Sequence, residues 1–522
     1  MFDIGTLSTV GALARENARR APARACNIFE GRVTTFAAFD GFCDRVANAI
    51  ADEGAERVAY VGKNCDLAFE IFVGSARAGA LFAPVNWRLA PPEIAAIVVS
   101  FDPQILFVGP ELVDAVTRVR GQLPAGLTLI AVEGGHPEWP DYAAWRDAAR
   151  GEPYPEQCRP EDPVLVLYTS GTTGLPKGAL ISHDNLFGQR RHTPPNLAYD
   201  HWRDDDVSLM SMPFAHIAGI GWWMLGFLNA CPNVITREFD PGAILQIIAR
   251  EGVSKLFLVP AALQFVVRHP AAAGTDFSRV NLICYGAAPM PLALLRESIA
   301  LIGCEFLQCY GLTETTGTIA MLLPEEHTLE GAPRMRSAGR AAPGSEIRIV
   351  DAAGAPLPVG EIGEIAIRGT AVMVGYHANP EATADVLDRD GWFRSGDAGY
   401  LDEEGFLYIH DRIKDMIITG GENVYPAEVE NAIFGHPDVN EVAVIGVPDE
   451  TWGEAVKAIV SARPGHKVDA ANVLAWTRER LAAFKCPKTV EVVDMLPRNA
   501  AGKVLKRELR RPFWSGQNRQ VH

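Results

Sequence analysis

Apolar runs alternate with amphipathic segments along the first 160 residues of the chain. Residues 10–21 and 36–54 place their apolar side chains at the spacing of a helix face. Two uninterrupted apolar runs, residues 58–61 and 105–108, are bounded by turn-forming residues, which is typical of buried strands. This alternation predicts an α/β fold with layered β-sheets and helices.

The middle of the chain continues this pattern. Residues 164–167, 256–260 and 282–286 are apolar runs, each of which predicts a strand that ends in a loop. Residues 179–181 predict one more strand, and Ser182 after it is a suitable N-cap for a helix that begins at His183.

Residues 207–236 contain no Asp, Glu, Lys or Arg, and His216 is the one side chain among them that could carry a charge near neutral pH. Pro213 and Pro232 interrupt the segment and leave a central run of about 14 apolar or small residues, shorter than the roughly 20 that cross a bilayer. We therefore expect a buried helix. Small residues along it should leave volume beside it: Gly219, Gly221 and Gly226.

The end of the chain has a different organisation. Residues 427–434 predict a helix, residues 442–447 a strand, and residues near 473–483 a second helix. These elements indicate a separate small α+β domain. A length of 522 residues is also too great for one core and predicts at least two domains.

Composition excludes several classes of protein. The net charge of −16 argues against a nucleic-acid binder, because neutralising phosphates requires clustered lysine and arginine. Nine scattered cysteines without a C-x-x-C pair indicate neither a disulfide framework nor a zinc site, and they favour a reducing compartment. Because no basic region precedes an apolar core at the N-terminus, we expect no secretory signal and a cytoplasmic protein.

A cluster of arginines near the start has two interpretations. It predicts a solvated helix face, and the alternative is weak peripheral contact with an anionic membrane. A homodimer also stays open. The cluster comprises Arg15, Arg19, Arg20 and Arg24.

The strongest chemical signal is the segment that follows the predicted strand at residues 164–167. Its glycines let the backbone bring N–H groups close to an anion, and its hydroxyls and lysine add donors and charge. It differs from a Walker A loop, since Pro176 precedes the lysine and Gly178 follows it. By itself such a cluster also fits a flexible surface loop. The predicted phosphate-binding residues are Thr169, Ser170, Gly171, Thr172, Thr173, Gly174 and Lys177.

Three further motifs carry chemistry. In the segment 310–315, an aromatic ring can stack on adenine, a hydroxyl can donate to a phosphate, and a carboxylate can hold Mg²⁺. The small residues at 286–290 follow a predicted strand and allow a flat ring to lie against backbone. Near the end of the chain, Gly502 predicts a tight turn that presents Lys503.

In this order the motifs resemble those of the adenylate-forming superfamily, which includes acyl-CoA synthetases, adenylation domains of peptide synthetases and beetle luciferases. The resemblance implies that Lys503, Thr313 and His216 are catalytic and that Glu314 and Thr169 hold Mg²⁺. His216 would border the acyl pocket, with Ala215 standing where the family usually has an aromatic. It also implies that these residues bind the nucleotide: Gly286, Ala287, Ala288, Tyr310, Gly311, Asp397 and Arg412.

The resemblance extends to the domains. It implies an N-terminal ATP- and acyl-binding domain, residues 1–411, and a mobile C-terminal domain, residues 412–522, that carries the catalytic lysine. Lys414 matches the hinge, and Gly420 and Gly421 match a loop beside the pantetheine arm of coenzyme A.

The implied activity is that of an ATP-dependent acyl-CoA ligase that uses ATP, Mg²⁺ and coenzyme A. Because residues 207–236 lack a fixed charge, a second substrate charge would stay unpaired at high cost, so we expect a medium- to long-chain fatty acid. An aryl or alicyclic acid, such as a cinnamate-like or steroid-derived one, fits the same reasoning. A luciferase-like enzyme or a stand-alone adenylating enzyme also stays open.

Overall fold

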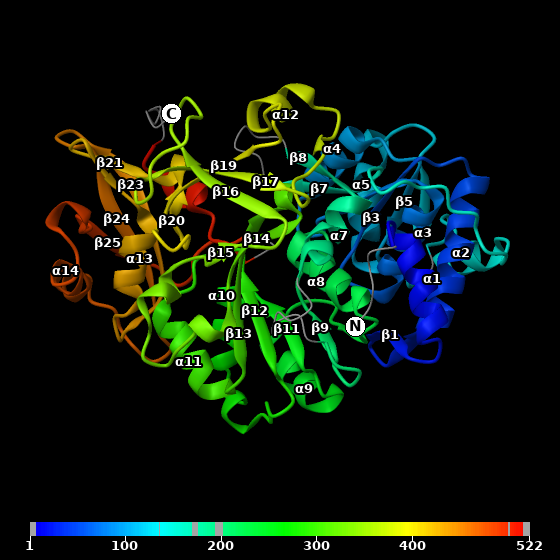
Figure 1. The fold of residues 1–522 in the computed structure, drawn as a ribbon, viewed down its shortest axis with the longest axis horizontal. Helices are drawn as coiled ribbons and strands as arrows, with labels where there is room; N and C mark the ends of the chain where they lie inside the picture. Colours follow the sequence, from blue (N-terminus) through cyan, green and yellow to red (C-terminus); the bar gives the residue numbers. More distant parts are fainter. Residues whose placement is uncertain (1–6, 135, 170–175, 194–201, 500–501, 515–522) are drawn as a thin grey trace.

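We analysed a computed structural model that describes residues 7–134, 136–169, 176–193, 202–499 and 502–514. A large N-terminal part contains three β-sheets, and a small C-terminal part contains a fourth (Figure 1). Among the helices in these ranges, none combines the length and apolar character that a membrane span requires. The predicted architecture, layered sheets and helices with a small α+β domain, is confirmed.

A seven-stranded sheet holds the predicted phosphate segment. Its strands lie in the order β18-β8-β7-β4-β3-β5-β6, and β7 and β8 form an antiparallel pair. The strands are β3 Arg57–Val61, β4 Leu81–Val85, β5 Ile105–Val108, β6 Thr128–Ala131, β7 Pro163–Thr169, β8 Lys177–Ser182 and β18 Gly375–Tyr376. Helices connect or flank them: α1 Val10–Arg20, α2 Phe36–Asp52, α3 Asp66–Ala78, α4 Pro91–Phe101, α5 Val113–Val119, α6 Tyr142–Ala148 and α7 His183–His192.

A nine-stranded sheet forms the centre of the molecule, in the order β15-β14-β13-β12-β11-β9-β10-β1-β2. Its strands are β1 Ala25–Phe29, β2 Arg32–Thr35, β9 Ser208–Met210, β10 Asn233–Ile235, β11 Lys255–Leu258, β12 Leu282–Gly286, β13 Glu305–Leu312, β14 Gly317–Leu322 and β15 Arg340–Ala341. The associated helices are α8 Ile217–Leu228, α9 Pro241–Glu251, α10 Pro260–Val267 and α11 Leu292–Ile302.

A four-stranded antiparallel sheet, ordered β16-β17-β19-β20, leads to the C-terminal part. It comprises β16 Ser345–Val350, β17 Gly363–Gly369, β19 Phe393–Leu401 and β20 Leu407–Arg412, with α12 Pro380–Val386 beside it. The C-terminal sheet comprises β21 Ile417–Thr419, β22 Glu422–Val424, β23 Val439–Asp449, β24 Gly453–Ala462 and β25 Thr489–Val492. Its helices are α13 Pro426–Phe434, α14 Ala470–Arg478 and α15 Lys506–Arg510.

Local chemistry explains the helix starts that the sequence predicts. The Ser182 side chain accepts a hydrogen bond from the Asn185 backbone N–H, and Asn185 Oδ1 accepts one from the Ser182 backbone N–H, as in a capping box. The predicted N-cap is therefore confirmed. The arginine cluster is partly structural, because Arg15 forms an ion pair with Asp44 at 2.8 Å.

The apolar segment 207–236 departs in part from the prediction. It contains the buried helix α8, but the three-residue strands β9 and β10 flank that helix. The expectation that three glycines leave volume is wrong for Gly219 and Gly226. A Cβ at Gly219 would lie 2.1 Å from the Pro213 carbonyl oxygen, and one at Gly226 would lie 2.4 Å from Asn233 Oδ1. Both glycines permit close packing, whereas a Cβ at Gly221 would make only ordinary contacts, the nearest at 3.5 Å from Ile217 Cδ1.

Candidate active site

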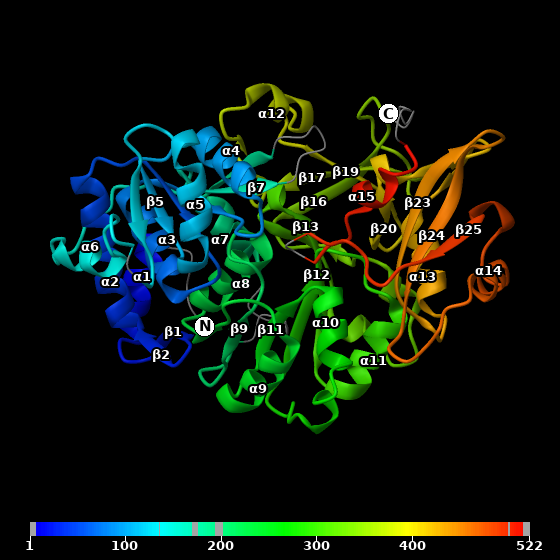
Figure 2. The same ribbon diagram turned by 180° about the vertical axis from the view of Figure 1, so that it is seen from behind.

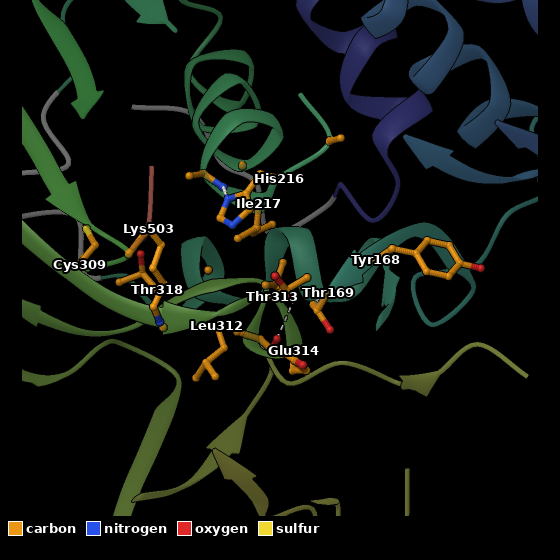
Figure 3. A pocket seen from close by; sticks show the side chains of 18 of the residues that line it. Tyr168, Thr169, His216, Ile217, Cys309, Leu312, Thr313, Glu314, Thr318 and Lys503 are labelled. Carbon is orange, nitrogen blue, oxygen red and sulfur yellow. Dashed lines mark hydrogen bonds between the residues drawn. The ribbon is translucent and has the colours of Figure 1, made fainter. Parts of the chain in front are cut away.

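A cavity of about 1260 Å³ joins most of the predicted site residues that the structure describes. Its wall includes the ends of β7 and β8, the start of α8, the β13–β14 connection and the turn that carries Lys503. Figure 3 shows Thr169, Thr313 and Glu314 close together, with His216 on the neighbouring end of α8. Residues that lie hundreds of positions apart in the sequence therefore share one space.

The β7–β8 pair fixes both ends of the predicted phosphate segment. Thr169 lies opposite Lys177 in the antiparallel register, and its hydroxyl donates to the Lys177 carbonyl oxygen at 3.3 Å. Both residues line the cavity. The predictions for Ser170, Gly171, Thr172, Thr173 and Gly174 lie outside the described residues.

A tyrosine that the sequence analysis missed connects the lysine of this segment to the predicted metal ligand. The Tyr376 hydroxyl donates to Glu314 Oε1 at 2.9 Å, and Lys177 Nζ lies 5.2 Å from the centroid of the Tyr376 ring. Because Tyr376 is 62 positions from Glu314 and stands on the two-residue strand β18, no local pattern indicates its role.

Close backbone packing shapes the predicted adenine region. A Cβ at Gly286 would lie 2.0 Å from the Cys309 carbonyl oxygen, and one at Gly311 would lie 1.5 Å from the Gly317 carbonyl oxygen. Ala287 adopts the left-handed conformation with φ of 64° and lines the cavity. Ala288 lines the adjoining space between the two domains, which shares several residues with the cavity. Small residues are therefore required here for steric reasons.

A carboxylate with two partners marks the predicted ribose site. Asp397 accepts a hydrogen bond from the Tyr310 hydroxyl at 2.6 Å and pairs with Arg412 Nε at 2.7 Å. Burial and the Asp397 charge raise the pKa of Tyr310 well above its usual value. Burial alone would lower the pKa of Arg412, but the nearby negative groups, Asp397 first, raise it. Both partners therefore keep their protons and act as donors at neutral pH.

Hydrogen bonds from Gly502 and Lys503 to Asn499 place Lys503 at this site. Gly502 has φ of 78°, its N–H donates to the Asn499 carbonyl oxygen, and the Lys503 N–H donates to Asn499 Oδ1 at 2.9 Å. Arg498 binds the Gly502 carbonyl oxygen at 2.6 Å and Glu441 at 2.5 Å, which anchors the turn to β23. The predicted tight turn is confirmed.

The Lys503 side chain is open to the cleft, although protein atoms crowd around its ammonium group. Burial, and next the charge of Arg412, lowers the pKa of Lys503 below its usual value, while Asp397 opposes the shift. The ammonium group is therefore partly desolvated, and nearby charges act on it strongly. A group that stabilises developing negative charge needs such an environment.

His216 is the N-cap of α8 and lies on the cavity wall. Its Nδ1 accepts the Ala218 backbone N–H at 3.2 Å, so in the neutral ring the proton is on Nε2. Burial, together with the charge of Lys503, lowers the pKa of His216 to about 4. The ring is therefore neutral at pH 7 and offers one N–H donor.

The predicted hinge lies between β20 and β21. Lys414 is exposed in a short 3₁₀ turn, residues 413–415, although desolvation by nearby protein atoms lowers the pKa of its ammonium group. Gly420 and Gly421 form the turn between β21 and β22 with φ of 59° and 85°. They are not among the described residues that line the cavity with Lys503. The structure thus separates the predicted coenzyme A loop from Lys503.

One face of α8 continues the cavity away from Lys503. Ala218, Gly221 and Leu225 line it at helical spacing, and around Gly221 the nearest side-chain atom to a built Cβ is Ile217 Cδ1 at 3.5 Å. Beside the far end of α8, Arg190 and Gln189 on α7 also line the cavity. Arg190 donates to Asn229 Oδ1 at 3.3 Å, the residue after α8. This part of the cavity wall therefore includes a cation, Arg190, in addition to the uncharged residues of α8.

The residues around Glu314 fit a bound Mg²⁺. One carboxylate oxygen of Glu314 accepts from Tyr376, which leaves the other oxygen for a hard cation, and Thr169 supplies a hydroxyl nearby. Within the described ranges, no group of three or more histidine, cysteine or acidic side chains could enclose a metal. A Mg²⁺ ion that also binds substrate phosphates needs only one or two protein carboxylates.

Comparisons with known proteins place the chain in a family. The family model of the AMP-binding enzymes matches residues 14–377, and that of the AMP-binding enzyme C-terminal domain matches residues 428–503. The chain is 38% identical to a fatty acid–acyl-carrier-protein ligase, ScoC, of Streptomyces coeruleorubidus over 99% of this chain and 98% of the relative.

Two further proteins extend the comparison. A feruloyl-CoA synthase of an Amycolatopsis species is 38% identical over 97% of this chain and 99% of the relative. The solved structure of a Mycobacterium tuberculosis fatty acyl CoA synthetase is 32% identical, with a TM-score of 0.75, and covers 98% of this chain and 99% of that one. The chain therefore belongs to the AMP-binding enzymes, the adenylate-forming superfamily of acyl-CoA synthetases that use ATP, Mg²⁺ and coenzyme A.

Proposed function

We propose that this AMP-forming acid–thiol ligase converts a hydrophobic carboxylic acid, first of all a medium- to long-chain fatty acid, to its coenzyme A thioester. The observation that carries the proposal is the cavity that runs from Lys503 along the uncharged face of α8. A helix of 12 residues is about 18 Å long, which provides room for an extended apolar tail.

In the first half-reaction, a carboxylate oxygen of the acid attacks the α-phosphorus of ATP and pyrophosphate leaves, which gives an acyl-adenylate. Lys503 and Thr313 bind the oxygens on which negative charge increases, and Lys177 binds the departing phosphates. His216 donates Nε2–H toward the carboxylate, and Asp397 accepts the ribose hydroxyls. Mg²⁺ held by Glu314 and Thr169 would supply further charge neutralisation at the phosphates.

In the second half-reaction, the thiol of coenzyme A attacks the acyl carbon and AMP leaves. We infer that the domain 412–522 rotates about Lys414 against the domain 1–411 between the two steps. The rotation removes Lys503 from the site and brings Gly420 and Gly421 beside the pantetheine arm. The separation of this loop from the cavity supports the proposal, because one orientation presents only one of the two groups.

A second candidate substrate is an aromatic acid with a polar group at its far end. Arg190 and Gln189 favour it, because these polar side chains can donate a further hydrogen bond to a phenolic or carbonyl oxygen at the far end of the acid but not to an apolar tail. The relatives named above act, according to their names, on a fatty acid and on ferulate.

A substrate panel separates these candidates. Purified protein is incubated with ATP, Mg²⁺, coenzyme A and one acid at a time: acetate, octanoate, palmitate, ferulate, a dicarboxylate and an amino acid. AMP, pyrophosphate and the thioester are then quantified. We expect the highest kcat/KM with octanoate or palmitate. ADP with acyl phosphate as products would overturn the mechanism, and ferulate as the best acid would favour the second candidate.

A further inference from the structure

One contact between the domains lies where α13 is followed by β23, away from the substrate cavity. Gln264 on α10 donates from Nε2 to Asn440 Oδ1 at 2.8 Å and to the Asn440 carbonyl oxygen at 3.1 Å. Arg268, which follows α10, donates from Nη1 to the same Oδ1 at 3.1 Å. One C-terminal side chain therefore accepts hydrogen bonds from two N-terminal residues.

An aromatic side chain reinforces this contact. Phe434, the last residue of α13, is 5% exposed and belongs to the buried apolar cluster that includes Leu263 of α10 and Leu294 of α11. The Arg268 guanidinium carbon lies 5.8 Å from the centroid of the Phe434 ring. Figure 2 shows α13 at the side of the molecule where α10 and α11 lie. The small domain thus buries a phenyl ring in the core of the large one.

The same helix also meets the turn that carries the catalytic lysine. A Cβ built at Gly502 would lie 3.3 Å from Val259 Cγ2, and Val259 is the residue immediately before α10. Helix α10 therefore supports the Lys503 turn at its start and holds Asn440 and Phe434 at its end. The orientation of the small domain, and with it the position of Lys503, depends on both contacts.

We propose that Gln264, Arg268, Asn440 and Phe434 form a clamp that holds the small domain in its adenylating orientation and sets the balance between the two half-reactions. The members lie on opposite sides of the hinge at 413–415, so a rotation there must break every contact of the clamp. They are positioning residues, since none of them lines the cavity around Thr313. This inference rests on the proposed domain rotation.

Two substitutions at one position test the clamp in opposite directions. Asn440→Ala removes the acceptor, so adenylation measured by rapid quench with ATP and acid should slow by roughly 3- to 30-fold. Thioester formation from supplied acyl-adenylate should keep its rate or become faster. Asn440→Asp keeps the acceptor and adds an ion pair with Arg268, so it should retain adenylation and slow thioester formation.

Asn472→Ala provides the matched control, because it is the same substitution at an exposed site on α14 of the same domain. The unfolding temperature of each variant shows whether the domain folds. Equal changes of both half-reactions in the Ala and Asp variants, or no change in either, would overturn the clamp. Lys503→Ala is measured in parallel: if it fails to separate the half-reactions, the rotation itself is wrong.

Discussion

The backbone N–H of Lys503 is held by Asn499, and burial and the charge of Arg412 lower the pKa of its side chain. Replacing it with alanine should slow adenylation by at least about 100-fold, roughly 3 kcal/mol, as deletion of one oxyanion donor does. Thioester formation from supplied acyl-adenylate should be largely unaffected, since the proposed rotation carries Lys503 away. Rapid-quench assays of each half-reaction measure both rates.

The control for this prediction is Lys467→Ala, which removes a lysine of the same domain whose side chain is exposed. It should leave both rates unchanged. If Lys503→Ala slowed the second half-reaction as strongly as the first, the assignment of Lys503 to adenylation would be incorrect.

A buried histidine should make stability depend on pH. His183 is 1% exposed and accepts the Val10 N–H at Nδ1, and burial lowers its pKa from 6.5 to about 4. Because the unfolded chain binds a proton that the folded protein excludes, the free energy of unfolding decreases as pH falls from 6.5 to 4. The full effect of this one group is on the order of 3 kcal/mol.

Comparing the unfolding temperatures of the wild type and His183→Gln would test this prediction. In the variant, the amide oxygen of the glutamine can still accept the hydrogen bond from the Val10 N–H. As the pH is lowered from 6.5 to 4.5, the unfolding temperature of the wild type should fall more than that of the variant, because only the wild type has His183. A difference that stays constant across this range would show that His183 takes up its proton in the folded state.

At the level of single residues, the sequence predicted those that belong to contiguous motifs. Thr169, Lys177, Thr313, Glu314 and Lys503 all line the cavity. The tyrosine that binds Glu314 escaped prediction, because Tyr376 and Glu314 meet only when β18 pairs with β8. The polar side chains of α7 escaped it too, since only the packing of α7 beside the end of α8 places them on the acyl wall.

In the proposed function, helix α8 limits how long a substrate tail can be. Gly221→Leu places a side chain in the acyl cavity, whereas Gly221→Ala adds one methyl group with ordinary contacts. The leucine should displace about four methylenes of a long tail, at roughly 0.8 kcal/mol each. The kcat/KM for palmitate should therefore fall by about 100-fold or more, with octanoate less affected and the alanine variant intermediate.

The ratio of kcat/KM values for palmitate and octanoate is the quantity to measure, because it is independent of the fraction of active enzyme. A ratio that did not change in either variant would mean that the acyl tail does not pass along α8.

Element prediction succeeded where an apolar run is long and its boundary carries a chemical signal. The run 164–167 lies within β7, and the serine cap correctly gave the start of α7. Strands β9 and β10 have three residues each, too few to show a period of two, so the sequence could not distinguish them from the ends of a buried helix. Sheet order was unpredictable because it joins segments such as β1 and β10, which pair across 200 residues.

For the molecule as a whole, the proposed rotation of the small domain depends on the backbone at Lys414. Lys414→Pro fixes φ near about −65° and should hinder the backbone rotation. Adenylation should be retained, because the structure already places Lys503 at the cavity. Thioester formation should slow, which is the reverse of the effect of Lys503→Ala.

Lys414→Ala serves as the comparison, since it removes the ammonium group but leaves the backbone free to rotate. If the proline and alanine variants behaved alike in both half-reactions, the side chain rather than the rotation would be responsible. Equal loss of the first half-reaction in Lys414→Pro and Lys503→Ala would refute the domain exchange.

Asp397 lies where the nucleotide site and the hinge meet, and this position has a thermodynamic consequence. Its carboxylate holds Tyr310 and Arg412, and Arg412 is the last residue before the hinge turn. In the proposed mechanism, ribose hydroxyls that bind Asp397 would compete with those two donors, and nucleotide affinity would then be linked to the preferred domain orientation through this one carboxylate. Such a linkage is reciprocal. If one domain orientation binds ATP or AMP more tightly by some factor, the bound nucleotide shifts the equilibrium toward that orientation by the same factor.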